Sequence, residues 1–549
     1  MAAHDLNSIA FPTLEPERLA SLDGCKFTER RTYRDGESLF KAGDSDGNFF
    51  VVKSGAIEII DDTGDAPKQI VVHGPGQFAG DVSQITGRPA VVSGVARGDT
   101  DVYAVSQRAL REILNSHPDL ADIIFQAFIA RRQLLRESKD FVGLRVIGPR
   151  SSPDTFRVRD FLAKNNTMFT WLDLEADPHV AEFMGQVGVT ATDTPVVACA
   201  TKLVLRNPSN RELANALGLR RKLENKRYDL VVVGGGPAGL AAAVYGASEG
   251  LCTVVVERVA PGGQAGRSMR IENYLGFPTG ITGSELADRA VLQASKFGAQ
   301  LPIATEAVRL SFGSSSPVLH IDDDETIEAK CVLIATGAEY RLLGIEGCER
   351  FEGRGVYYAA TPIEAQMCKD ADVVVVGGGN SAGQAAVFLS KQARKVYLVI
   401  RGNDLTKSMS QYLATRVQNT EEIEILCNSE VQRLDGDGNL GQVELINKKT
   451  GNVRTFQCPA LFSFIGAVPR TDWLPPEIER DDKRFVLTGP AAAKSGRWSG
   501  KRTPFFLETT YPGVFAAGDV RSGSVKRVAS AVGEGSMAVQ FVHEHLKDM

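Results

Sequence analysis

Residues 229–239 read Asp-Leu-Val-Val-Val-Gly-Gly-Gly-Pro-Ala-Gly, and this stretch decides the fold. Its continuous apolar run predicts a buried strand, and the small residues of 240–249 predict a helix directly after the glycines. Gly234 permits a tight turn, Gly236 lets the backbone approach a pyrophosphate, and Gly239 lets the helix pack close to the strand. The stretch therefore predicts a dinucleotide-binding turn.

The residues that follow complete this unit. A second apolar strand is expected over Thr253–Val256, and it ends in Glu257, eighteen residues after Gly239. A carboxylate at the end of this strand can accept hydrogen bonds from the two hydroxyls of a ribose. Strand, turn, helix, strand and acid together predict a Rossmann-like α/β domain.

A second turn of the same kind begins 143 residues further along the chain. Residues 372–382 read Asp-Val-Val-Val-Val-Gly-Gly-Gly-Asn-Ser-Ala, with a helix expected over 383–390 and a strand over 396–400. The residue after that strand is Arg401, not an acid. A cation there suits the 2′-phosphate of NADPH, so we expect NADPH to be preferred over NADH, with Lys407 as a second cation.

Two such turns in one chain indicate a flavin and its nicotinamide reductant. A third signal is Gly513-Val-Phe-Ala-Ala-Gly-Asp519, a strand expected to place Asp519 beside the ribityl and phosphate region of the flavin. We expect Gly533-Glu-Gly535 to open the last helix below it.

These residues resemble the low-molecular-weight thioredoxin reductases, the two-domain type, from roughly Tyr228 to Leu546. Further motifs carry the resemblance: Pro261-Gly-Gly-Gln264, Ile271-Glu-Asn-Tyr-Leu-Gly-Phe-Pro278, Ala335-Thr-Gly337, Gly353-Arg-Gly-Val356 and Phe464-Ile-Gly466 with Pro469. The resemblance implies an FAD domain in two parts, 228–345 and 463–549, interrupted by an NADPH domain at 346–462.

The turns and the resemblance together assign residues to each cofactor. The residues expected at FAD are Gly234, Gly236, Pro237, Ala238, Gly239, Glu257, Gly263, Gln264, Asn273, Ala335, Thr336, Gly337, Asp519 and Val528. The residues expected at NADPH are Gly377, Gly379, Asn380, Ser381, Ala382, Arg401 and Gly466.

The reactive dithiol of thioredoxin reductases has no counterpart in this sequence. The resemblance puts it just after Gly353–Val356, where Ala359 and Pro362 stand in place of its cysteines, and Cys368 lies six residues further on. Reduction of a disulfide needs a thiolate that attacks it. We therefore identify no catalytic residue and expect an FAD-dependent NADPH oxidoreductase whose electrons go to a quinone, a ferredoxin or flavodoxin, another small acceptor, or oxygen.

The acceptor side of the flavin is expected at Glu272, Asn273 and the segment 359–364. Two alternatives stay open. One is a thioredoxin-disulfide reductase that uses other thiols, such as Cys368. The other is a redox- or nucleotide-responsive regulatory protein.

Residues 1–140 have the pattern of an antiparallel roll followed by helices. Short strands are expected over Phe49–Val52, Ile57–Ile60, Ile70–Val72, Val91–Val95 and Val102–Val105, then helical spacing over 107–139. Tyr33-Arg-Asp-Gly-Glu37 and Phe49-Phe-Val-Val-Lys-Ser-Gly55 resemble the glycine turns of cyclic-nucleotide-binding domains.

That resemblance implies a candidate cyclic-nucleotide pocket at Gly80, Asp81 and Arg88. Ala90 stands where the family has its phosphate-binding arginine, and we expect Arg88 to lie about 7 Å away along a strand. A cyclic nucleotide as partner and a purely structural or dimerising roll both stay open.

Residues 141–219 alternate between strand and helix: Leu144–Ile147, Phe156–Asn165, Phe169–Leu174, His179–Val187 and Pro195–Ala200. Thr194-Pro195 before a strand resembles the cis-proline position of glutaredoxin and thioredoxin modules. The loop that would carry their dithiol reads Ser151-Ser-Pro-Asp154, so a docking module is expected. Residues 220–227 form a charged linker to the first dinucleotide turn.

Composition excludes several classes. The 549 residues carry a net charge of −5 and eight cysteines at least 17 residues apart, without a CxxC pair or metal-ligand spacing. We therefore expect no metal site and no nucleic-acid binding. Without an apolar run of 18 residues or an N-terminal signal, we expect no membrane span and a cytoplasmic protein. A homodimer is expected, because the reductases that the chain resembles are dimeric and the helix over 118–135 carries an apolar stripe. Packing of that stripe on its own roll stays open as the alternative.

Overall fold

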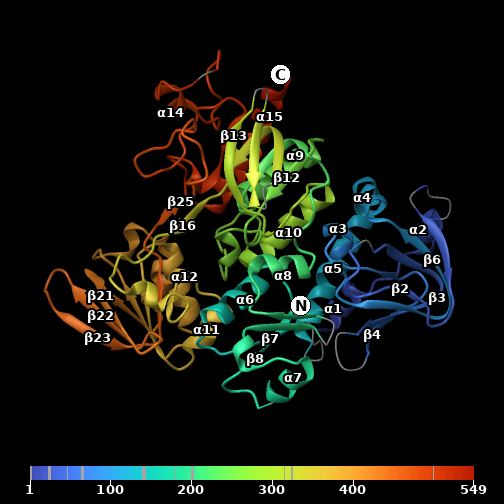
Figure 1. The fold of residues 1–549 in the computed structure, drawn as a ribbon, viewed down its shortest axis with the longest axis horizontal. Coiled ribbons are helices and arrows are strands. Elements are labelled where there is room, and N and C mark those ends of the chain that lie inside the picture. The colour runs from blue at the N-terminus through green and yellow to red at the C-terminus, as the bar shows by residue number, and fades with distance from the viewer. Residues whose placement is uncertain are drawn as a thin grey trace.

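The computed structural model of the chain describes residues 3–22, 26, 28–45, 47–62, 67–138, 144–178, 180–199, 203–313, 316–322, 325–498 and 500–549. Figure 1 shows the N-terminal roll in blue on one side, the middle domain near the centre, and the orange hairpin sheet on the opposite side. None of the helices in these ranges has both the length and the apolar character that a membrane crossing needs. Cys25 lies outside the described residues.

The N-terminal roll is one antiparallel sheet with helices packed against it. Its strands are β1 (Glu29–Tyr33), β2 (Ser38–Phe40), β3 (Phe49–Asp61), β4 (Lys68–His73), β5 (Phe78–Ala79) and β6 (Ser93–Val105), in the order β1-β6-β3-β4 with β2 on β6 and β5 on β3. Its helices are α1 (Ala3–Ala10), α2 (Pro16–Leu22), α3 (Ser83–Thr86), α4 (Gln107–Ser116) and α5 (Pro118–Glu137).

Two pairs of predicted short strands are continuous in the structure, so the prediction of breaks between them was wrong. Gly55 (φ +76°) lies inside β3 and Gly98 (φ +73°) lies inside β6. The register between the two strands shifts around Ser54, so the glycines form bulges instead of turns. A Cβ at Gly55 would stand 2.4 Å from the carbonyl oxygen of Asp99.

The apolar stripe of α5 packs on its own roll. Ile124, Ala127 and Phe128 are at most 1% exposed and share a core with Phe49 and Phe78. The same core includes Leu292 of α10 (Gly283–Lys296), so the roll also rests on the dinucleotide-binding part. Because this stripe is already covered, it gives the predicted homodimer no support, and the oligomeric state stays a prediction.

The middle domain has a four-stranded sheet in the order β10-β9-β7-β8. Its elements are β7 (Leu144–Gly148), α6 (Pro153–Lys164), β8 (Phe169–Asp173), α7 (Val180–Val187), β9 (Val196–Cys199), β10 (Leu203–Arg206) and α8 (Asn210–Ala216). β7 and β8 are parallel, whereas β9 pairs antiparallel with both β7 and β10. The Thr194–Pro195 peptide is cis, as the sequence predicted, while β10 and α8 were not predicted.

The first dinucleotide turn belongs to a sheet in the order β12-β11-β15-β14-β13, with β26 beside β15. Its elements are β11 (Arg227–Val233), α9 (Pro237–Ser248), β12 (Thr253–Val256), α10, β13 (Ala307–Phe312), β14 (Pro317–Ile321), β15 (Thr326–Ile334), α14 (Gly489–Lys494), β26 (Val514–Ala516) and α15 (Val528–Lys547). β26 comes from the far end of the chain, so two distant segments build this one sheet.

The second turn belongs to a separate sheet in the order β17-β24-β18-β19-β20. Its elements are β17 (Val356–Tyr357), α11 (Pro362–Ala365), β18 (Asp372–Val376), α12 (Asn380–Leu389), β19 (Lys395–Val399), α13 (Gln411–Gln418), β20 (Ile423–Leu426) and β24 (Ala460–Ser463). A hairpin sheet of β21 (Ser429–Asp435), β22 (Gln442–Asn447) and β23 (Val453–Gln457) is attached to it. The strands β16 (Ala338–Tyr340) and β25 (Ala467–Pro469) pair where the chain crosses between the two sheets.

Three helices of the dinucleotide-binding part do not begin where predicted. α9 begins at Pro237, three residues before the predicted start at 240. α12 begins at Asn380, three residues earlier than predicted, because Gly379 is its N-cap. α15 begins at Val528, so Gly533 and Gly535 lie inside it and do not open it. Gly535 is needed there because a Cβ would meet the carbonyl oxygen of Ala238 in α9 at 2.0 Å.

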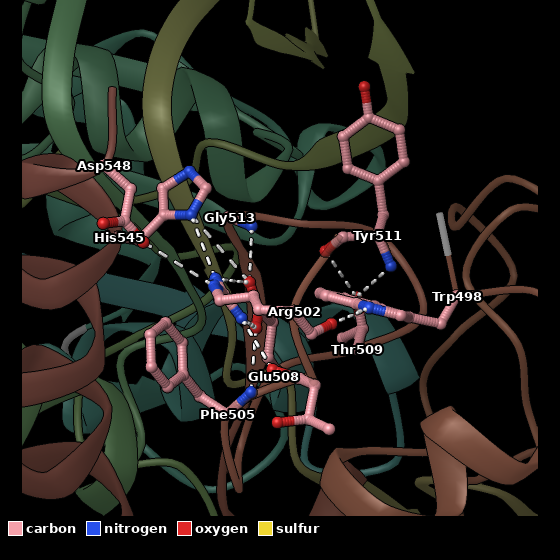
Figure 2. A network of polar contacts seen from close by, with 10 residues as sticks. Trp498, Arg502, Phe505, Glu508, Thr509, Tyr511, Gly513, His545 and Asp548 are labelled. Atoms are coloured by element: carbon pink, nitrogen blue, oxygen red, sulfur yellow. Dashed lines mark hydrogen bonds and ion pairs between the residues drawn. The ribbon is translucent and has the colours of Figure 1, made fainter. Parts of the chain in front are cut away.

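A buried ion pair fixes the segment that leads into β26 (Figure 2). Arg502 donates from Nη1 and Nη2 to the two carboxylate oxygens of Glu508, at 2.6 and 2.9 Å, and the Glu508 side chain is fully buried. The backbone N–H groups of Phe505 and Gly513 donate to the same carboxylate, each at 2.9 Å. This network sets the start of β26, the strand that leads to Asp519.

Candidate active site

A cavity of about 860 Å³ lies at the carboxyl ends of β11 and β12. Most residues predicted at FAD line it: Gly234, Gly236, Pro237, Ala238, Glu257, Gly263, Gln264, Ala335, Thr336, Gly337, Asp519 and Val528. Ligands of open α/β sheets bind outside the carboxyl ends of the strands, which is where this cavity lies. Gly239 and Asn273 are the two predicted residues outside the lining.

The turn at Gly234 has the geometry that a dinucleotide needs. Gly234 has φ +108°, and a Cβ there would lie 2.4 Å from the carbonyl oxygen of Ala335. At Gly236, the N-cap of α9, a Cβ would meet its nearest atom only at 4.0 Å, so the backbone faces open space. A Cβ at Gly239 would lie 1.9 Å from the carbonyl oxygen of Gly234, so its role is close packing below the cavity.

The Glu257 carboxylate accepts backbone hydrogen bonds from two segments beside the cavity. Its Oε2 accepts a hydrogen bond from the backbone N–H of Gly235 at 2.7 Å. Its Oε1 accepts from the backbone N–H groups of Val259 at 2.8 Å and Ala260 at 3.2 Å. The carboxylate therefore holds the glycine turn against the chain after β12 while it lines the cavity.

Asp519, which follows β26 in the chain, also lines the cavity. Burial raises the pKa of its carboxyl, Lys526 opposes that rise, and Glu534 adds to it. Lys526 donates from Nζ to the carbonyl oxygen of Asp519 at 2.6 Å. Both side chains line the cavity together with Val528, the first residue of α15.

The second turn repeats the strand–glycine–helix geometry between β18 and α12. Gly377 has φ +141°, and a Cβ there would meet the carbonyl oxygen of Phe464 at 2.6 Å. Ser381 is the one residue of the predicted NADPH set that lines the main cavity. The other members, Gly377, Gly379, Asn380, Ala382, Arg401 and Gly466, lie outside that lining.

Arg401 lies two residues after the end of β19 and its side chain is exposed. Lys407 is exposed nearby and donates from Nζ to Oδ1 of Asn403 at 3.4 Å. Asn380, at the start of α12, accepts at Oδ1 from the backbone N–H of Ser410 at 2.8 Å. The turn and the exposed cation therefore lie at the carboxyl ends of neighbouring strands, a suitable place for a phosphorylated ribose.

Helix α6 of the middle domain forms part of the wall of the main cavity. Asp160, Ala163, Lys164 and Asn166 all belong to the lining. Lys164 forms an ion pair with Asp160, and burial lowers the pKa of the Lys164 ammonium. This contact could not be predicted from the sequence, because it joins two domains whose motifs are separate.

Helix α6 is anchored on both dinucleotide-binding sheets. The Asn165 side chain donates from Nδ2 to the carbonyl oxygen of Val259 at 3.0 Å, and Asn166 donates to Oδ1 of Asp288 at 2.5 Å. At the other end, the ring of Phe156 lies 5.5 Å from that of Tyr357. The cover over the cavity is therefore attached at both ends.

Only part of the segment expected at the acceptor side, residues 359–364, lines the cavity. Thr361, Pro362 and Ile363 line the cavity, whereas Ala359 and Ala360 do not. Glu272 also lies outside the lining, because both of its carboxylate oxygens accept from Nη1 of Arg416 in α13, at 3.0 and 2.9 Å. The expectation that Glu272 and Asn273 line the cavity was therefore wrong.

Cys368 lies away from the cavity. Its side chain is fully buried, and its thiol donates to the carbonyl oxygen of Glu364 at 3.3 Å. Burial raises its pKa to about 12, and Glu364 and Cys458 add to the effect. Within the described parts of the chain, the lining of the main cavity contains no cysteine.

Residues 228–535 match the family described as pyridine nucleotide-disulphide oxidoreductase, which is more than half of the chain. The chain belongs to this family. Thioredoxin reductase of Bacillus subtilis is 33% identical over 327 residues, covering 59% of this chain and 97% of that protein. Thioredoxin reductase of Treponema pallidum is 36% identical over 320 residues, covering 58% and 97%.

Solved structures give the same assignment. The crystal structure of Lactococcus lactis thioredoxin reductase in the FR conformation matches with a TM-score of 0.53 and 28% identity, covering 59% of this chain and all of that one. Thioredoxin reductase of T. acidophilum also matches with a TM-score of 0.53 and 28% identity. As a thioredoxin-reductase-like oxidoreductase, the chain uses FAD and NADPH, and its two glycine turns fit one dinucleotide each.

A second part of the chain, in the N-terminal roll, also matches a known family. Residues 30–117 match the cyclic nucleotide-binding domain family. Gly80 and Asp81 line a cavity inside this roll. Arg88 does not line it, so its predicted place in the pocket was wrong: Nη1 of Arg88 donates instead to the carbonyl oxygen of Asn165 in the middle domain, at 2.9 Å.

Proposed function

We propose that this oxidoreductase takes hydride from NADPH and passes the electrons from FAD to an acceptor that is not a protein disulfide. The observation that carries the proposal is the wall formed by Thr361, Pro362 and Ile363. The likeness to thioredoxin reductases puts the dithiol at Ala359 and Pro362, and neither residue can form a mixed disulfide.

The thiol nearest in sequence does not replace the missing pair. A thiol reacts as its thiolate, and Cys368 has its pKa raised to about 12 by burial. Its side chain is fully buried and lies outside the cavity lining. These features disfavour the alternative of a disulfide reductase that uses Cys368.

The cover over the cavity favours a small acceptor. Asp160, Lys164 and Asn166 of the middle domain line the same cavity as Pro362. A partner protein would have to displace α6 to bring a disulfide to that wall, whereas a small molecule would not. We infer that the middle domain, thioredoxin-like in its strand order and cis-proline, serves as this fixed cover and not as a redox carrier.

The coenzyme is proposed to be NADPH because of the cation after β19. Arg401 stands exposed where an acid would favour NADH, and Lys407 lies nearby. Bound FAD supplies the reversible two-electron chemistry, and bound NADPH supplies the hydride. The chain holds the flavin pyrophosphate at the start of α9 and keeps Glu257 and Asp519 on either side of the cavity.

The test is anaerobic stopped-flow reduction of the flavin by NADPH and by NADH, followed by mixing with an acceptor. We expect fast bleaching that is selective for NADPH, rapid reoxidation by a naphthoquinone, and no NADPH-dependent reduction of oxidised thioredoxin or of an aromatic disulfide. Cys368→Ala serves as the matched control and should leave the quinone reaction unchanged. Disulfide reduction that is lost in Cys368→Ala would overturn the proposal, and so would slow bleaching without turnover.

A further inference from the structure

A second cavity, of about 310 Å³, lies inside the N-terminal roll. This volume is at the small end of the range for ligand sites, about 300 to 1,000 Å³. Most of its wall is apolar and includes Phe11, Phe40, Ile59, Val71, Val92 and Leu134. The cavity is separate from the main cavity and shares no lining residue with it.

The cavity presents little positive charge to an anion. Ala90 lines it where the likeness to cyclic-nucleotide-binding domains would put an arginine, and Arg88 points outward to Asn165. Arg131 lines the cavity but its guanidinium is tied to the wall. It donates to the carbonyl oxygens of Ala10 at 2.7 Å, Gly80 at 2.5 Å and Phe78 at 2.9 Å.

Two carboxylates add negative charge to the lining, and one of them, Asp81, lies 3.8 Å from Nε of Arg132 in α5. Asp81 and Asp61 both line the cavity, and Asp61 is only 4% exposed. Lys68, the second cation of the described lining, lies on the exposed end of β4. A cyclic phosphodiester in this cavity would meet as many carboxylates as cations, and an anion site without a bidentate cation loses most of its affinity.

His73 supplies an unused polar atom. Its side chain is 2% exposed and lines the cavity, and its Nδ1 has no hydrogen-bond partner among the residues that the structure describes. Burial, with Arg131 adding to it, lowers the pKa of His73 to about 3, so the imidazole is neutral at physiological pH. A buried polar atom of this kind is normally paired, and a neutral imidazole nitrogen pairs well with a hydroxyl or carbonyl group.

We propose that this cavity binds an uncharged, mostly apolar small molecule that hydrogen-bonds to His73, in place of an anionic cyclic nucleotide. The apolar wall takes the body of the ligand, and His73 Nδ1 takes its single polar group. An uncharged ligand needs no cation at position 90. A cavity with Ala90 in its wall can therefore still bind it. The inference concerns the roll alone and does not depend on the proposed electron acceptor.

The test is isothermal titration calorimetry of the full-length FAD-loaded protein with three probes. 1-Naphthol is neutral with one hydroxyl group, 1-naphthoate has the same rings with a carboxylate, and cyclic AMP is the anionic nucleotide. We expect 1-naphthol to bind with a Kd at least tenfold below that of either anion. The flavin absorbance spectrum, recorded in parallel, should not change, because the flavin site is not involved.

Two variants locate the binding. His73→Phe keeps a ring but removes the nitrogen, and it should weaken 1-naphthol about fivefold while leaving 1-naphthoate unchanged. Ala90→Leu fills part of the cavity and should weaken 1-naphthol at least tenfold. His320→Phe, on β14 of the other sheet, is the control and should change nothing. Tighter binding of cyclic AMP, no binding of 1-naphthol, or binding unaffected by both roll variants would each overturn the proposal.

Discussion

Arg88 of the roll donates from Nη1 to the carbonyl oxygen of Asn165 at 2.9 Å, and Asn165 is the C-cap of α6 in the middle domain. Arg88 belongs to the segment between Gly80 and Ala90. Both of these residues line the roll cavity, although Arg88 itself does not. Helix α6 lines the main cavity. One hydrogen bond therefore joins the segment around the roll cavity to the helix that lines the main cavity.

Removing this link should loosen the roll from the middle domain. Arg88→Ala leaves a buried carbonyl without its charged donor, a loss of about 1–3 kcal/mol of unfolding free energy. We expect the first unfolding transition to move to lower denaturant, measured by circular dichroism in urea. Arg97→Ala, an exposed residue of β6, is the control and should stay within about 0.5 kcal/mol of the wild type. Equal effects of the two variants would contradict a specific role for Arg88.

Lys164 should contribute to FAD binding from outside the two dinucleotide-binding sheets. Lys164→Met removes a cation from the cavity and leaves Asp160 unpaired there, and FAD carries two phosphate charges. We expect the Kd of FAD to rise about tenfold, which corresponds to about 1.4 kcal/mol. The measurement is quenching of flavin fluorescence as FAD is titrated into the apoprotein.

The double variant Asp160→Asn with Lys164→Met is the matched control, because it removes both charges together. Its affinity for FAD should lie between those of the wild type and Lys164→Met. An unchanged Kd in Lys164→Met would show that α6 covers the cavity without helping to hold the cofactor.

The features that the sequence predicted are local ones. The tight turns at Gly234 and Gly377 were predicted correctly, because a turn between a strand and a helix is encoded in adjacent residues. Gly55 was misread as a break, since a glycine with positive φ can belong to a turn or to a bulge, and only the partner strand decides which.

Contacts between domains could not be predicted in the same way. Lys164 reaches the main cavity through the docking of one domain on another, and nothing in the residues around it differs from an ordinary exposed helix. Arg88 was misplaced because it was expected in a strand-like segment, whereas it lies between α3 and β6 and its guanidinium binds the carbonyl oxygen of Asn165 in another domain. That partner is distant in the sequence, so the residues around Arg88 do not indicate it.

Arg401 should determine the choice of coenzyme. Arg401→Ala removes the exposed cation after β19, so the 2′-phosphate of NADPH loses its charged partner. We expect the KM for NADPH to rise about tenfold and that for NADH to stay within twofold, in steady-state assays with a quinone acceptor. Lys407→Ala is the comparison and should have a smaller effect. An equal rise for both coenzymes would place Arg401 outside the phosphate site.

The ion pair of Figure 2 should be a large contributor to stability. Arg502→Met leaves the fully buried Glu508 carboxylate without its bidentate partner, a change that costs about 3–5 kcal/mol in comparable sites. We expect a lower thermal transition and weaker retention of flavin, because β26 leads to Asp519. Arg497→Met, whose side chain is more exposed and faces Glu479 at 3.6 Å, is the control and should have little effect.

His73 should make the stability of the roll depend on pH. Its folded-state pKa is lowered to about 3 from an ordinary 6.5, mainly by burial, so between these values the unfolded chain binds the extra proton and the folded chain does not. Stability from this group is therefore complete above about pH 6.5 and falls as the pH is lowered, by up to about 2 kcal/mol at pH 5. Urea unfolding of the wild type and of His73→Phe at pH 7.5 and 5 measures the difference. His73→Phe should lose less stability between these two pH values than the wild type, and parallel losses in both proteins would mean that His73 is protonated in the folded roll.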